Sequence, residues 1–180
     1  AWACSQDWVA YYTSHFPSID GWHVLPDRDP STFLDVANVC SAVAERYAGT
    51  FDDQGNPTLL AMEIWNEPNT KWFGPWGSTG KPDAAAYARL LKAAYLGVKQ
   101  GHGTHAAAPM IPIITGGTSP AASHAVTTDS YTPAEFLSAI YAEIGVGYFD
   151  HVGHHPYNFP HSLAQNASTN AFYQTGAAYS

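Results

Sequence analysis

Positively charged residues are scarce in this chain. Only 7 of its 180 residues are Lys or Arg, against 15 Asp or Glu, which gives a formal net charge of −8. The few basic residues are scattered along the sequence. Because phosphate binding needs clustered Lys and Arg, we expect neither nucleic acid nor an anionic membrane as a partner.

Cysteines and long apolar runs are also few. The 2 cysteines, Cys4 and Cys40, are too few to define a disulfide framework. A bridge between them requires export, and otherwise two reduced thiols are expected. No apolar run has transmembrane length, and no signal peptide is visible. The chain starts at Ala1 without an initiator Met and is interpreted as truncated, so the compartment stays open, secretion included.

Apolar and aromatic residues are abundant. Hydrophobic residues make up 46% of the chain and aromatic residues 14%, including 6 Trp and 11 Tyr. A chain of this length and composition can bury a real core, and a single domain is expected. The aromatic side chains also suit surfaces that stack on sugars.

One stretch, residues 60–69, organises the rest of the sequence. It begins as an apolar run and ends in Asn66-Glu67-Pro68. The run is too short for a helix, and Pro57 and Pro68 stand at its two ends. Pro68 disfavours helical geometry at Glu67 and cannot donate to a sheet ladder. We therefore predict a buried strand whose carboxyl end places Glu67 in a cleft.

Predicted strands and helices alternate along the chain. Helical stripes of apolar residues are bounded by capping signals, such as Asp29 before the first helix and the capping box of Thr132 and Glu135 before the third. Continuous apolar runs predict strands that are covered by helices. Strands are predicted at residues 1–3, 60–67, 110–115 and 148–155, and helices at residues 30–48, 83–100, 133–144 and 170–180.

This alternation predicts an α/β fold with a parallel sheet and flanking helices. Four strand–helix units are half of a (β/α)8, or TIM, barrel, which carries its site at the carboxyl ends of its strands. A flavodoxin-like open sheet is the alternative, but no Gly-rich phosphate loop joins a strand to a helix. We predict a partial barrel in which residues 1–180 are part of a single catalytic domain, truncated at both ends.

The end of the central strand resembles a known family. Trp65-Asn66-Glu67-Pro68 is similar to the signature on the fourth strand of clan A retaining glycoside hydrolases, with families 39 and 5 as the nearest branches. The resemblance implies that Glu67 is the general acid/base and that Asn66 hydrogen-bonds the sugar 2-hydroxyl. It implies a β-linked oligosaccharide or polysaccharide as substrate and no cofactor. On the residues alone, a buried Trp, an Asn in a turn and a surface Glu stay an alternative.

Two further matches support this resemblance. His155-Pro156-Tyr157 resembles the His-x-Tyr at the end of the sixth strand in clan A, which implies that His155 lines the sugar site and Tyr157 contacts the nucleophile. Ordinary capping of a strand end is the alternative. Trp2 resembles a Trp at the end of the third strand. Trp2 and Trp72 are therefore candidates for sugar stacking, although the Trp72 loop also suits packing on the barrel rim.

The second carboxylate of a retaining enzyme is expected elsewhere. Retaining glycosidases need two carboxyl groups roughly 5–5.5 Å apart. Glu63 shares a strand face with Glu67 but is expected about 13 Å deeper, from the rise per residue in a strand. We therefore predict a buried, structural Glu63 with a polar partner. The family's nucleophile lies on the seventh strand, which on this count lies beyond Ser180, so the 180 residues alone are expected to be inactive.

Two other functions stay open. The first is a non-catalytic carbohydrate-binding barrel that keeps the aromatic rim. The second is a metalloenzyme, because His151, His154 and His155 are close in sequence, as are His102 and His105. Alternate residues of a strand point to opposite faces, so one strand cannot offer its three histidines to one ion. The other pair has no Cys or carboxylate nearby, and we expect no metal.

Overall fold

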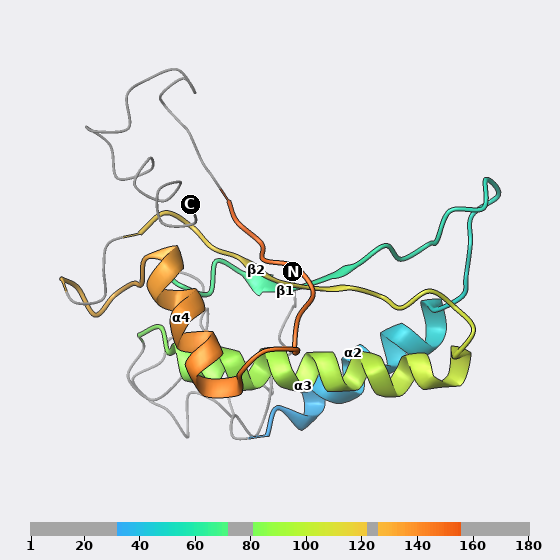
Figure 1. The fold of residues 1–180 in the computed structure, drawn as a ribbon, viewed down its shortest axis with the longest axis horizontal. Coiled ribbons are helices and arrows are strands. Elements are labelled where there is room, and N and C mark those ends of the chain that lie inside the picture. The colour runs from blue at the N-terminus through green and yellow to red at the C-terminus, as the bar shows by residue number, and fades with distance from the viewer. Residues whose placement is uncertain (1–31, 72–80, 122–125, 156–180) are drawn as a thin grey trace, which may run out of the picture.

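The computed structural model describes residues 32–71, 81–121 and 126–155. This part of the chain is a mixed α/β structure with a small parallel sheet and three helices (Figure 1). The predicted α/β class and the parallel pairing are confirmed. In chain order the elements are α2 (Leu34–Tyr47), β1 (Met62–Asn66), α3 (Ala84–His102), the 3-10 turn η1 (Gly103–His105), β2 (Ile113–Gly117) and α4 (Pro133–Ile144).

The sheet pairs β1 with β2, placing Met62 opposite Ile113 and Asn66 opposite Gly117. The segment that ends at residue 155 runs parallel to β2 on its other side, through bridges of His151 to Ile114 and of His154 to Thr118.

This third segment forms isolated bridges rather than the continuous strand predicted at residues 148–155. Between the two bridges the chain through β2 advances from residue 114 to 118, one residue past the end of β2, whereas the segment advances only from 151 to 154. The extra residue on β2 is a bulge, and a bulge interrupts the ladder. There the N–H of Gly153 donates to the Thr115 hydroxyl at 2.9 Å instead of to a backbone carbonyl.

The helix boundaries follow local signals. Asp83 caps α3 by accepting hydrogen bonds from the N–H groups of Ala85 and Ala86, both at 3.0 Å. The predicted capping box of Thr132 and Glu135 is present at the start of α4. The predicted cap of the first helix, Asp29, lies outside the described residues. Within them, α2 begins after Phe33, whose φ is 51°.

Helix α3 is the centre of the core. It packs against both α2 and α4, and Figure 1 shows α2 and α3 together on one side of the strands. The Phe136 ring of α4 lies 5.3 Å from the Tyr87 ring of α3. The predicted apolar stripe of α3 is confirmed, since four of its residues are buried: Tyr87, Leu91, Ala94 and Val98. None of the described helices is long and apolar enough to cross a membrane.

Helices α2 and α3 touch through their backbones. A Cβ added to Gly97 would overlap the carbonyl of Ala37, and one added to Gly101 would overlap the carbonyl of Ser41. Two glycines four residues apart therefore let the helices approach closely, because neighbours at this spacing share a helix face. Glycine inside a helix costs about 0.5–1 kcal/mol relative to Ala, and the close packing offsets that loss.

Replacing Gly97 by Ala should separate the two helices. We expect Gly97→Ala to lower the free energy of unfolding by about 1–3 kcal/mol, the usual cost of overpacking. The matched control is Gly103→Ala, at a helical φ of −55° with open space around it. The control should be neutral or stabilising by up to about 1 kcal/mol. Urea unfolding of both variants checks this, and equal losses would contradict the close contact.

Candidate active site

The backbone at the end of β1 is strained. Trp65 has a φ of 77° and Glu67 a φ of 45°, and both belong to the left-handed region that non-glycine residues rarely adopt. β1 ends at Asn66, so the chain leaves the sheet at Glu67, as Pro68 predicted. The Glu67 N–H still donates to the Gly117 carbonyl at 3.0 Å. Strain of this kind costs about 1–3 kcal/mol per residue and clusters at functional sites.

The Tyr87 hydroxyl connects the two strands beside this strained segment. It donates to the Ile64 carbonyl at 2.9 Å and accepts from the Gly116 N–H at 2.6 Å. The Tyr87 side chain is fully buried, and burial raises its pKa, so the hydroxyl keeps the proton that it donates. A Cβ on Gly116 would lie 2.7 Å from the Ile64 carbonyl oxygen. Only glycine therefore fits opposite the kink of β1, which is the positive-φ backbone at Trp65.

Glu67 and His155 meet at the carboxyl ends of the strands. Glu67 is 8% exposed, and its Oε1 lies 3.1 Å from His155 Nδ1. The His155 backbone N–H donates to the Thr118 carbonyl at 2.9 Å, which fixes the residue beside β2. A Cβ on Gly117 would overlap the His155 ring, so this glycine makes room for the imidazole. The two motifs that the sequence singled out therefore lie in one site.

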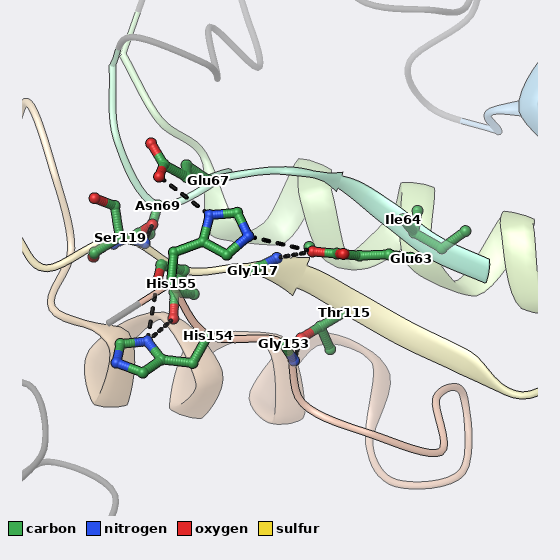
Figure 2. Close-up of polar contacts among 12 residues, drawn as sticks. Glu63, Ile64, Glu67, Asn69, Thr115, Gly117, Ser119, Gly153, His154 and His155 are labelled. Atoms are coloured by element: carbon green, nitrogen blue, oxygen red, sulfur yellow. Dashed lines mark hydrogen bonds and ion pairs between the residues drawn. The ribbon is translucent and has the colours of Figure 1, made fainter. Parts of the chain in front are cut away.

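Glu63 also belongs to this site, which corrects the prediction made for it. Figure 2 shows the His155 ring between Glu67 and Glu63. His155 Nε2 lies 3.7 Å from Glu63 Oε1, and that oxygen accepts the Gly117 N–H at 2.7 Å. A polar partner was predicted correctly, but burial was not, since 45% of the side chain is exposed. The prediction considered only the distance between Glu63 and Glu67 along the strand, whereas the His155 ring lies between the two carboxyl groups and contacts both.

The other predicted site residues are less fully placed. Asn66 is the last residue of β1 and is exposed, so its side chain is accessible to a ligand. Trp2, Trp72 and Tyr157 lie outside the described residues. Cys4 also lies outside them, and Cys40 is a buried free thiol whose pKa burial raises to about 11.

Asn69 is a site residue that the sequence analysis missed. Its side chain is fully buried. Its Nδ2 donates to the carbonyls of Ser119 at 2.7 Å and of Tyr131 at 2.9 Å, and its Oδ1 accepts from the Ser119 N–H at 2.9 Å. Asn69 thus ties the loop that follows Glu67 to the segments that follow β2. Its position directly after Asn66-Glu67-Pro68 was the only available signal, and a turn Asn gives no indication of burial.

Three other histidines in the described part of the chain make contacts away from Glu67. His154 points away from Glu67 (Figure 2), and its Nδ1 lies 3.0 Å from the Thr118 carbonyl. Burial is the main cause that lowers the pKa of His154, and the hydrogen bond from its Nδ1–H to the Thr118 carbonyl opposes part of this effect. His102 and His105 each direct Nε2 at backbone carbonyls. The described residues contain no cluster of three or more metal-ligating side chains.

No protein-family model, curated protein or solved structure matches the chain. A functional hypothesis therefore rests on the site itself. A carboxyl group withdrawn from solvent, with an imidazole within hydrogen-bond distance, can hold a proton and exchange it. That arrangement suits general acid/base chemistry.

Removing the Tyr87 hydroxyl should weaken the sheet at the kink. Tyr87→Phe leaves the Ile64 carbonyl and the Gly116 N–H without this partner, and each unsatisfied buried group costs about 1–3 kcal/mol. We expect a loss of about 2–4 kcal/mol in the free energy of unfolding. The control is Tyr95→Phe on the same helix, which keeps the edge contact with Tyr148. Denaturant titration compares the two, and a loss no larger than that of the control would contradict the bridging role.

Asn69→Ala tests the connection between the loops. The variant removes three hydrogen bonds from a buried position, and we expect it to destabilise the protein by about 2–4 kcal/mol. Asn38→Ala, at an exposed position of α2, should stay within about 0.5 kcal/mol of the parent. Amide exchange should also be faster at Ser119, whose N–H donates to the Asn69 side chain, and at Tyr131, whose N–H donates to the Asn69 backbone carbonyl that this side chain holds in place. Unchanged protection at both amides would argue against the connection.

Proposed function

We propose that this chain is part of the (β/α)8-barrel domain of a clan A-like retaining glycoside hydrolase that cleaves β-linked oligosaccharides or polysaccharides. One observation carries the proposal. Glu67 and His155 belong to separate motifs of the resemblance, and the 3.1 Å contact between their side chains brings both motifs to one edge of a parallel sheet. Parallel strands of a barrel carry the catalytic groups at this edge.

The arrangement of the strands supports a barrel over a doubly wound sheet. The three parallel segments lie in sequence order, with β2 between β1 and the segment that ends at His155. Right-handed crossovers between strands in sequence order place every connecting helix on the same face. Helices α3 and α4 accordingly touch each other through Tyr87 and Phe136. A doubly wound sheet needs a reversal of strand order, and the described residues have none.

In the proposed reaction Glu67 protonates the leaving glycosidic oxygen while a second carboxylate bonds to the anomeric carbon. Glu67 then takes a proton from the water that releases the sugar from that carboxylate. The proposal assigns the second carboxylate to a seventh strand outside residues 1–180. Asn66 binds the 2-hydroxyl and Tyr157 contacts the nucleophile, while Trp2 and Trp72 stack on the substrate. The reaction needs no cofactor.

The test is Glu67→Gln in the protein expressed from its complete gene. A positioned general acid contributes about 10²–10⁴-fold, and we expect a rate loss of that size on natural glycosides. Aryl glycosides with acidic leaving groups need little protonation, so their glycosylation step, measured as a pre-steady-state burst, should change far less. Glu45→Gln, on the exposed face of α2, is the control and should leave both rates unchanged.

Three outcomes are informative. A large loss on natural glycosides with a preserved burst on aryl glycosides supports Glu67 as the acid. Equal losses of the glycosylation step on both substrates would remove Glu67 from that role. Binding of oligosaccharides without any turnover by the parent protein would replace the enzyme with a non-catalytic carbohydrate-binding barrel.

A further inference from the structure

Glu63 has a place in the site that the proposed reaction does not use. Its Oε1 accepts the Gly117 N–H at 2.7 Å and lies 3.7 Å from His155 Nε2. The other nitrogen of the same ring, Nδ1, lies 3.1 Å from Glu67 Oε1. One imidazole therefore has a carboxyl group beside each of its nitrogens. The nitrogen that carries the ring proton determines which carboxyl group the ring can donate to.

The tautomer of His155 decides which form of Glu67 it supports. A neutral imidazole has one N–H donor and one acceptor nitrogen. With the proton on Nε2, the ring donates towards the Glu63 carboxylate, and Nδ1 can accept only from a protonated Glu67. With the proton on Nδ1, the ring donates to Glu67 and supports its ionised form. A general acid must start the reaction protonated.

Charged neighbours favour the first arrangement. Among the described residues, the titratable groups around the His155 ring are Glu63, Glu67, Tyr87 and His154. Burial raises the pKa of Tyr87 and lowers that of His154, so both are neutral at pH 7. Glu63 places its carboxyl group on the Nε2 side of the ring, 3.7 Å from that nitrogen. A carboxylate beside one imidazole nitrogen favours the proton on that nitrogen, and a Glu67 that keeps its own proton donates to Nδ1 instead of competing for the proton of the ring.

We propose that Glu63 is a positioning residue that holds His155 as its Nε2–H tautomer and thereby keeps the acid proton on Glu67. The catalytic consequence rests on the proposed function, whereas the tautomer is a property of the folded site. A purely structural Glu63 would only anchor β2 through the Gly117 N–H. The two roles separate in Glu63→Gln, because the amide keeps an oxygen acceptor for Gly117 but presents no negative charge to His155.

The test reads the tautomer directly. The protein expressed from its complete gene is labelled with ¹⁵N-histidine, and the ring nitrogens of His155 are assigned by comparison with His155→Gln. Near pH 7 we expect the parent to carry its proton on Nε2 and Glu63→Gln to shift it wholly or partly to Nδ1. Glu45→Gln should give the parent spectrum. A parent that carries a proton on Nδ1, alone or together with Nε2, or an unchanged tautomer in a folded Glu63→Gln, would overturn the proposal; if the variant does not fold, the parent spectrum can still overturn it.

Kinetics separate this inference from the proposed function. Glu63→Gln should lower kcat on natural glycosides about 10–100-fold, the range typical of residues that orient a functional histidine. KM and the burst on activated aryl glycosides should change little, because those substrates need little protonation. If the tautomer shifts as expected but the parent cleaves no glycoside, the proposed function fails and the positioning role stands. If the parent is active but its tautomer is Nδ1–H, the positioning role fails alone.

Discussion

The hydrogen bonds of one buried hydroxyl hold the site in shape. At Trp65 the backbone of β1 turns into the left-handed region, and Tyr87 binds both Ile64 and Gly116 beside that turn. Without the Tyr87 hydroxyl, the Ile64 carbonyl and the Gly116 N–H would lose this hydrogen-bond partner, and proteins almost always avoid unpaired buried backbone groups. The hydroxyl belongs to α3, and this helix is held in position because it packs against both α2 and α4. The packing of α3 therefore determines where β1 bends and where Glu67 points.

The site depends as much on missing side chains as on those present. Gly116 lets β2 approach the kink of β1, and Gly117 leaves room for the His155 ring. The Gly117 N–H donates to the Glu63 carboxylate, and the Gly117 carbonyl accepts from the Glu67 N–H. Consecutive glycines at the end of a buried strand thus let one backbone segment contact the Glu63 carboxylate, the Glu67 backbone and the imidazole of His155. This is the physical reason that Gly116-Gly117 ends the apolar run of β2.

Sequence reasoning succeeded where the signal was local. The capping box of α4 and the apolar stripe of α3 depend on residues within a few positions of each other, and the structure confirms them. The meeting of Glu67 with His155 followed from the rule that parallel strands end at one edge. The role of Glu63 and the burial of Asn69 were missed. Both depend on how far a ring or an amide reaches across separate segments, which residue spacing does not encode.

The strain and the buried polar contacts concentrate where the chemistry is proposed. Three described non-glycine residues have a positive φ, and two of them, Trp65 and Glu67, lie at this site, where the surrounding core must stabilise them. Asn69 fixes the chain immediately after Glu67, and His155 contacts the Glu67 carboxyl group from the segment beside β2. The carboxyl group is thus oriented before any ligand arrives, so its ordering entropy is spent in folding. In the proposed reaction this preorganisation would lower the barrier, because the proton donor is already in position when the substrate binds.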